Sequence, residues 1–375
     1  MARRYFVALG SILWLGLCAT LTAISAHAAK PGGGSVQNCA GAVPSFVFNR
    51  AVSGSTRKDI FLANAAATCT QFLFSVTAGS YVRALSFRIV EQPGGVRQGR
   101  VLATDGLNVL RLVRFTIGDD MVLSNLQDDV VFEPSQSGFI DEGFDLAADG
   151  RRLVYVTADE TAESDAVITP AASRIYRMRV LADVGACADA VTPCRYDAGP
   201  LVTERTGSSF RLEFPRWSVD GSAIFVVDYE GDAWSPNISR IRLPTPTDPL
   251  ETVIKVSRGL ARELTLYQVR PDPTVAEVLI YGAKPLVGPN GSKCRELRVS
   301  RSSDGTRVDS ATRVLVGGGA SQQSADAASR RLVLDGAKES KTGVCSSTGT
   351  LLSAIDNGST VQLTSLTNGF RPATP

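Results

Sequence analysis

The sequence predicts an all-β protein built from repeated units, and three observations lead to this class. Arg216-Trp217-Ser218-Val219-Asp220-Gly221 is followed at once by an apolar β run, residues 224–227. Asp149-Gly150 precedes a second run of the same kind, residues 153–156. No convincing amphipathic helix is found beyond the first residues. Because Asp bonds its own backbone and Gly accepts positive φ, each copy predicts a strand, a tight turn and a second strand.

The predicted strands fall into six successive units. They lie at residues 45–50, 59–64 and 71–73; at 84–89, 100–103, 109–115 and 121–132; at 144–156 and 173–178; at 214–227 and 239–243; at 267–273, 277–282 and 296–299; and at 324–336 and 351–364. A spacing of very roughly 50–70 residues with Asp-Gly turns is typical of β-propeller blades with inserted loops.

The two ends of this β region are expected to meet. Residues 369–375 resemble the start of a further unit that breaks off, and they are expected to share a blade with the early strand at residues 45–48. Sharing one blade would close the ring and protect the strand edges. A pair of stacked β-sheets is the alternative architecture, since the repeat rests on short motifs.

The repeat resembles that of the TolB-like β-propeller family. That family's repeat carries an aromatic-Ser-x-Asp-Gly turn, an apolar strand, an Ile-Tyr strand and an Asp-x-Gly turn ending in Leu-Thr. The matches here are residues 216–221, Ile175-Tyr176, and Ile355-Asp356-Asn357-Gly358 with Leu363-Thr364. The resemblance covers about residues 44–375. It implies a six-bladed propeller that binds other proteins on one face, and it brings no catalytic residue.

The first residues have the pattern of an export signal. Arg3 and Arg4 are basic, residues 5–24 are apolar, and Ala26-His27-Ala28 is an Ala-x-Ala cleavage site. We expect a cleaved signal peptide at residues 1–28, a flexible leader at 29–43 and the propeller at 44–375. An uncleaved membrane anchor is the alternative. The predicted mature protein is periplasmic or secreted, without a membrane span.

Charge and histidine content narrow the class of function. Lys and Arg number 39 and Asp and Glu 37, so loss of Arg3 and Arg4 with the signal leaves a balanced chain. Nucleic-acid binding is therefore not expected. The single histidine, His27, belongs to the predicted signal. Catalysis by a Ser-His-Asp or Cys-His arrangement is disfavoured, because its general base would be missing.

Six cysteines follow the predicted signal, an even number that suggests disulfides in an exported chain. Cys187 and Cys194 lie close together in a Pro/Ala/Asp-rich insertion and predict a local bridge. Cys39–Cys69 and Cys294–Cys345 are the remaining pairings that we expect, although spacing alone leaves other connectivities open. No Cys-x-x-Cys pair occurs, which disfavours a zinc site.

One loop carries the candidate site residues. Asp228, Glu230 and Asp232 place three carboxylates after the strand at 224–227, which suits calcium. A solvated loop is the other interpretation. Trp234 is a candidate partner contact, or else packs on its own blade. No other cofactor is expected.

These patterns predict an exported, non-enzymatic, monomeric propeller that binds or scaffolds a protein or cell-envelope partner. The alternative is a calcium-assisted hydrolase or lactonase that uses the loop carboxylates.

Overall fold

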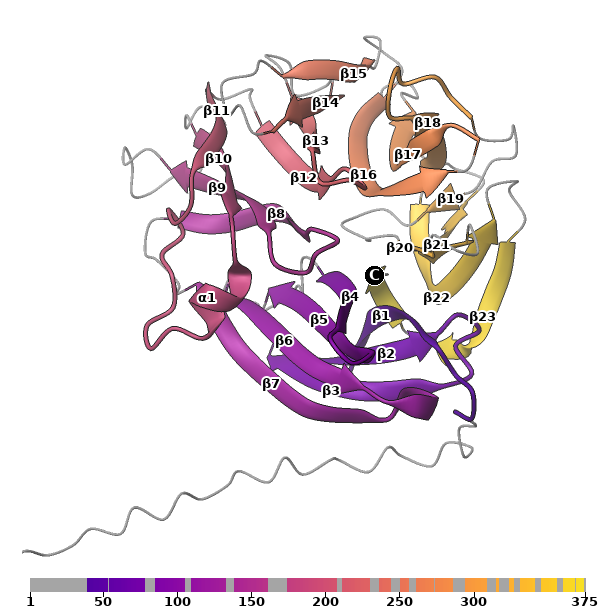
Figure 1. The fold of residues 1–375 in the computed structure, drawn as a ribbon. Helices are drawn as coiled ribbons and strands as arrows, with labels where there is room; N and C mark the ends of the chain where they lie inside the picture. Colours follow the sequence, from indigo (N-terminus) through magenta and orange to yellow (C-terminus); the bar gives the residue numbers. More distant parts are fainter. Residues whose placement is uncertain are drawn as a thin grey trace, which may run out of the picture. The chain divides into compact units, whose positions relative to one another are not determined.

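The computed structural model describes the chain from Cys39 onward, with gaps, and its compact unit spans Gln37–Pro375. The described residues are 39–52, 54–77, 85–104, 109–132, 138–160, 174–207, 211–229, 236–243, 250–255, 261–272, 274–285, 294–308, 315–316, 324–326, 331–340, 345–355, 360–367 and 369–373. Nearly all their regular structure is antiparallel β-sheet (Figure 1). The predicted all-β class is confirmed.

One sheet joins the two ends of the β region, and we call it the closing sheet. Its strand order is β24 (Gly369–Ala373), β1 (Pro44–Ala51), β2 (Arg57–Asn64) and β3 (Thr70–Thr77). Val47 pairs with Ala373, and Asn49 pairs with Phe370. The predicted meeting of the 369–375 segment with the first strand is therefore confirmed.

Three further sheets are simple meanders whose strands pair in chain order. The β4–β7 sheet contains β4 (Leu85–Gln92), β5 (Val96–Thr104), β6 (Leu110–Ile117), the 3-10 turn η1 (Asp119–Met121) and β7 (Leu123–Phe132). The β8–β11 sheet contains β8 (Gly138–Leu146), β9 (Leu153–Glu160), β10 (Arg174–Leu181), the short helix α1 (Val184–Ala188) and β11 (Leu201–Gly207). The β12–β15 sheet contains β12 (Arg211–Trp217), β13 (Ala223–Tyr229), β14 (Pro236–Arg242) and β15 (Glu251–Lys255).

The remaining strands form one eight-stranded sheet. They are β16 (Ala261–Asp272), β17 (Ala276–Pro285), β18 (Arg295–Arg301), β19 (Leu315–Val316), β20 (Ser324–Asp326), β21 (Arg331–Glu339), β22 (Cys345–Ile355) and β23 (Thr360–Thr367). A single pairing, Val316 with Gly336, joins the β16–β19 part to the β20–β23 part.

The first strands of successive sheets contact one another. β4 contacts β8, β8 contacts β12, β12 contacts β16, and β16 contacts β20. β20 then contacts β24 and β1, and both of these contact β4. In Figure 1 these contacts can be followed from indigo to yellow. Each sheet thus has two neighbours, which is the propeller arrangement and excludes the two-sheet stack.

The core lies between neighbouring sheets. One apolar cluster joins Phe74 of the closing sheet to Phe87 and Phe115 of the β4–β7 sheet. Another joins Trp217 and Ile224 of the β12–β15 sheet to the β8–β11 sheet. A third cluster, with Leu112 and Phe144, joins the β4–β7 sheet to the β8–β11 sheet, so both faces of these two sheets are buried by different partners. Among the described residues, no helix has the length and apolar character needed to cross a bilayer.

Candidate partner-binding face

The Asp149-Gly150 turn joins β8 to β9 as the sequence predicts. Gly150 has φ +67°, a conformation that favours glycine. The Asp149 carboxylate accepts hydrogen bonds from the N–H groups of Arg151 (2.7 Å) and Arg152 (3.0 Å), and from the Arg152 guanidinium (2.7 Å). Partial burial raises the pKa of Asp149, but these three hydrogen bonds lower it by a larger amount, so the pKa lies below its usual value.

The Asp220-Gly221 turn joins β12 to β13 with the same chemistry. Gly221 has φ +70°. Asp220 accepts hydrogen bonds from the N–H of Ser222 (2.9 Å) and the hydroxyl of Ser218 (2.7 Å). These donors lower the pKa of Asp220. Trp217, next to the turn, is buried, with only 3% of its surface exposed.

The turns of neighbouring sheets bond to one another. Arg100 of β5 donates to the carbonyl of Gly150 (2.6 Å), and Arg152 donates to the carbonyl of Gly221 (3.1 Å). The Arg152 guanidinium also lies 4.8 Å from the centre of the Trp217 ring. The N–H of Val219 donates to Glu277, at the start of β17 (2.6 Å). The turns after β4, β8, β12 and β16 therefore share one end of the sheets.

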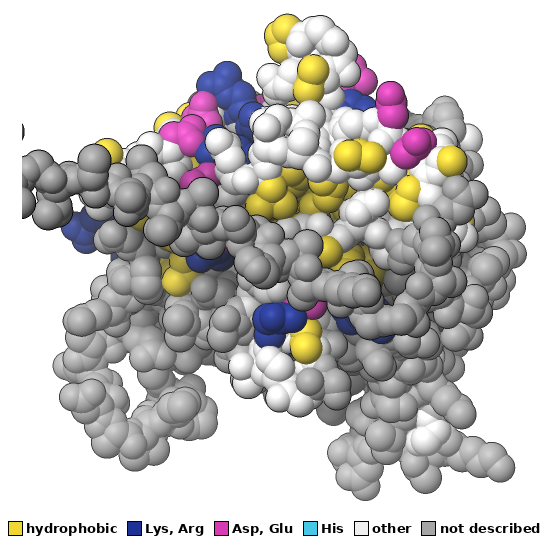
Figure 2. Space-filling model, turned by 90° about the horizontal axis from the view of Figure 1, so that it is seen from below, with side chains coloured by type: hydrophobic (Ala, Val, Ile, Leu, Met, Phe, Trp, Pro, Cys, Tyr) yellow, Lys and Arg dark blue, Asp and Glu magenta, His cyan; other side chains and the backbone are white. Residues whose placement is uncertain are grey.

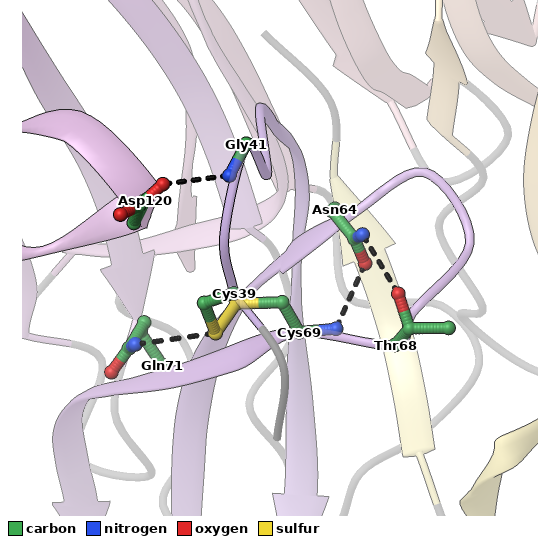
Figure 3. The surroundings of a disulfide bond; sticks show 7 residues. All are labelled: Cys39, Gly41, Asn64, Thr68, Cys69, Gln71 and Asp120. Carbon is green, nitrogen blue, oxygen red and sulfur yellow. Dashed lines mark hydrogen bonds between the residues drawn. A yellow bond between two sulfur atoms is a disulfide. The ribbon is translucent and has the colours of Figure 1, made fainter.

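We call this end the turn face. It also includes the β6–β7 turn at η1, because an antiparallel third strand ends where the first strand ends. The segment before β1 reaches this end as well, since the N–H of Gly41 donates to Asp120 of η1 (2.6 Å, Figure 3). The connections after β10 and β18 belong to it for the same geometric reason.

Exposed aliphatic side chains stand on the turn face. Val122 is 61% exposed after η1, Val96 is 45% exposed at the start of β5, and Val219 is 40% exposed in the β12–β13 turn. Val43 and Val308 are exposed in the adjoining segments. Figure 2 shows hydrophobic side chains among charged ones on the side that it draws. Val122 and Val96 belong to one sheet and Val219 to another, so exposed apolar side chains occur at the same end of two sheets. Exposed apolar surface of this kind makes the turn face the candidate interaction site.

Beneath the turn face, a buried polar network joins the first strands of four successive strand groups, β4, β8, β12 and β16. Asp145 of β8 accepts hydrogen bonds from Ser86 (3.0 Å) and Arg88 (3.1 Å) of β4, and from the N–H of Trp217 (3.1 Å). Arg216 of β12 donates to the carbonyls of Tyr267 in β16 (2.7 Å) and of Phe144 in β8 (3.2 Å). Desolvation lowers the pKa of Arg216. These groups hold the sheets in place.

The predicted carboxylate site is only partly described. Asp228 lies within β13, where a loop was expected, because the apolar run continues through Asp228 and the buried Tyr229 into a full strand. Its buried side chain forms an ion pair with Arg205 of β11 (3.2 Å). Glu230, Asp232 and Trp234 lie outside the described residues. Within the described ranges, no group of three or more His, Cys, Asp or Glu side chains could hold a metal ion.

Two of the expected disulfides are formed, Cys39–Cys69 and Cys187–Cys194. Cys39–Cys69 ties the segment before β1 to the β2–β3 turn (Figure 3). The N–H of Cys69 also donates to the side chain of Asn64 (3.1 Å). Cys294 is disulfide-bonded as well. The side chain of Cys345 lies outside those described, so the pairing Cys294–Cys345 stays a prediction.

Two features of this region escaped the sequence reasoning. Asp304-Gly305 after β18 forms a third turn of the same kind: Gly305 has φ +72°, and Asp304 accepts from the N–H of Thr306 (2.8 Å). The Asp-Gly pair alone was a sufficient signal for it. The buried charges of Asp145 and Arg216 were also missed. Their signal is a charged residue inside an apolar strand, as in Phe144-Asp145-Leu146.

Comparisons with known proteins agree with the fold. No protein-family model matches the sequence, and a comparison with curated proteins finds no match. The structure is similar to TolB from Acinetobacter baumannii, with a TM-score of 0.53 and 10% identity, covering 88% of this chain and 66% of TolB. An oligogalacturonate lyase from Vibrio parahaemolyticus also matches, with a TM-score of 0.48 and 10% identity, covering 85% of this chain and 74% of the lyase. The predicted resemblance to a TolB-like β-propeller is thus confirmed at the level of the fold. This chain spans about two thirds of the length of the TolB structure.

Proposed function

We propose that this protein is an exported, six-bladed β-propeller that binds another protein of the cell envelope through its turn face. The observation that carries the proposal is the set of exposed valines, above all Val122, Val96 and Val219, on turns that hydrogen bonds lock together. A rigid surface loses little conformational entropy when a partner docks, so apolar contacts on it are effective. The TolB-like fold adds support by analogy only.

The count of six blades is supported by the strand contacts. β4, β8, β12, β16 and β20 each begin a group of four strands in chain order, and β24 completes the closing sheet. The single pairing between β19 and β21 joins two such groups into one sheet. Blades of four strands are typical of propellers.

Export is supported by the disulfides Cys39–Cys69 and Cys187–Cys194, because disulfides form in oxidising compartments. Cell fractionation with and without residues 1–28 tests it. The full-length chain is expected in the periplasm or medium and the shortened chain in the cytoplasm. Equal location of both would contradict export by this segment.

Substitution of the exposed valines tests partner binding. We would capture proteins from the exported fraction with the wild type and with the variant Val122→Asp/Val219→Asp. Both side chains are exposed, so the fold should tolerate the change. A matched control is Thr56→Asp in the β1–β2 turn, since Thr56 is exposed and this turn lies at the end of the closing sheet opposite to the turn face.

The proposal requires that one defined protein is captured by the wild type and the control and is lost with the double variant. Capture of the same proteins by all three would contradict binding at this face. Turnover of a sugar, lactone or peptide substrate, abolished by Glu230→Gln/Asp232→Asn, would instead favour the calcium-assisted hydrolase. Metal analysis of the purified protein would separate the two mechanisms, because the hydrolase needs a bound ion.

A further inference from the structure

The connection between β10 and β11 is a disulfide-closed insertion, residues 182–200, which we call the strap. It begins with Asp183, whose carboxylate accepts from the N–H of Gly185 (2.9 Å) and caps the short helix α1. Cys187 in α1 is joined to Cys194. Between them, Val191 is fully exposed. The sequence predicted the disulfide, but it gave no sign of where the insertion docks.

The strap leaves its own sheet and packs on the neighbouring β4–β7 sheet. Helix α1 contacts β6 and β7. The N–H of Cys194 donates to the carbonyl of Val131 in β7 (3.0 Å), and Cys194 forms an isolated parallel bridge with Phe132. The strap therefore covers one end of the outer edge of β7. Covered edges are protected from pairing with other chains.

An ion pair and an aromatic cluster complete the contact. Arg114 of β6 donates two hydrogen bonds to Asp189 of the strap, and one to Asp129 of β7 (2.8 Å). The Tyr196 ring lies 5.5 Å from the Phe132 ring. Tyr196 and Phe132 belong to one buried apolar cluster with residues of β5, β6, β8 and β9. The strap thus fills the seam between the β4–β7 and β8–β11 sheets.

The other side of the strap is anchored to its own sheet. The hydroxyl of Tyr155 in β9 donates to the carbonyls of Tyr196 (3.2 Å) and Ala198. Burial raises the pKa of Tyr155, which keeps this donor protonated. Arg151 forms an ion pair with Asp183 (2.7 Å). The strap therefore bridges two sheets and is fastened to both.

The anchoring groups lie close to the two cysteines in sequence. Asp189 follows Cys187 by two residues, Tyr196 follows Cys194 by two, and Cys194 itself bonds to β7. Helix α1 spans only Val184–Ala188, which is too short to be stable without other contacts. The position of these groups therefore depends on the bridge between Cys187 and Cys194.

We propose that the Cys187–Cys194 disulfide is a redox latch that holds the strap across this seam, independently of the function proposed above. A dithiol reduces it by two electrons. One thiolate attacks the sulfur of Cys194, the less buried of the two residues, and displaces Cys187 as a thiolate, which takes up a proton. The second thiol then closes the reductant's own disulfide and releases Cys194 as a thiol. The freed strap leaves the edge of β7, and the propeller remains folded.

Hydrogen–deuterium exchange of the oxidised wild type and of Cys187→Ser/Cys194→Ser tests the latch. Peptides from the strap and from residues 129–132 should exchange at least roughly 10-fold faster in the variant, because local opening exposes their N–H groups. Peptides from β12–β14 should be unchanged. The matched control is Cys39→Ser/Cys69→Ser, which should alter peptides from residues 39–77 and leave the strap protected.

Two further measurements keep the test decisive. If the double serine variant fails to fold, the folded wild type is treated with dithiothreitol, alkylated and measured at once, with mass spectrometry locating the alkylated cysteines. Arg114→Gln removes the ion pair to Asp189 but keeps the disulfide, and it should leave the strap attached. Unchanged exchange of the strap after loss of the Cys187–Cys194 bridge would overturn the proposal. Equal acceleration in every sheet would also overturn it, since the disulfide would then act on the whole fold.

Discussion

The buried carboxylate of Asp145 offers the sharpest test of how the sheets are held together. Asp145→Ala removes the acceptor for Ser86, Arg88 and the N–H of Trp217 at once. It leaves the Arg88 guanidinium largely buried and close to the fully buried Arg216. Removing one partner of a buried ion pair costs about 3–5 kcal/mol. The free energy of unfolding should fall by this amount.

A matched control and a double variant isolate the cause. Asp128→Ala breaks an ion pair with Arg111 (2.9 Å) in which both side chains are more than a quarter exposed. Exposed pairs contribute about 0–1 kcal/mol, so this variant should be nearly neutral. In a double-mutant cycle, Asp145→Ala/Arg88→Met should cost less than the sum of the single changes by about 1–3 kcal/mol.

Guanidinium chloride unfolding, followed by tryptophan fluorescence, measures these differences. Trp217 is buried beside Asp145 and reports on the same region. The reasoning would be refuted if Asp145→Ala and Asp128→Ala lowered the unfolding free energy equally. Additive effects of Asp145→Ala and Arg88→Met would also refute the claimed coupling.

Three other predictions follow from the turns and the closing sheet. Gly221→Ala should lower the free energy of unfolding by roughly 1–2 kcal/mol, because Gly221 has a positive φ. The loss should exceed that of Gly54→Ala, because of these two positions a Cβ would meet Arg152 only at Gly221. Equal shifts of the melting temperature in the two variants would contradict this. Deleting residues 369–375 removes β24, so size-exclusion chromatography should show larger species than it does for the wild type; an unchanged elution volume would contradict ring closure. The pKa of Asp220 lies below 3.8 in the folded state, so the ionised carboxylate contributes its full stabilisation above about pH 3.8. This contribution is lost as the pH falls through the pKa that Asp220 has in the folded state. The stability gap between wild type and Asp220→Asn should therefore narrow on acidification, and a constant gap would contradict it.

Local chemistry explains why much of the fold was predictable. The Asp220-Gly221 and Asp149-Gly150 turns are set by groups within a few residues, so their sequence is enough to identify them. The apolar strands β9 and β13 follow directly from them. The meeting of β1 with β24 followed from counting units, because an incomplete unit at each end needs a partner.

The rest depended on contacts that sequence does not display. Asp228 was placed in a loop because it is acidic, yet Arg205, distant in sequence, compensates its burial within β13. The strap contacts Arg114 and Phe132 of another sheet, and its own sequence does not display these partners. The charge of Arg216 is tolerated because three backbone carbonyls accept its hydrogen bonds. Each of these cases reflects tertiary contacts overriding local preference.

The pairing of β24 with β1 has a consequence for biogenesis. The ribosome makes β1 long before the strand that must lie beside it. Until β24 has been made, β1 has an unpaired edge, and such edges are prone to aggregation. The closing sheet of a nascent chain therefore stays incomplete until β24 has left the ribosome. Maturation then ends with the slow joining of segments far apart in sequence, since loop closure over such a distance is entropically costly.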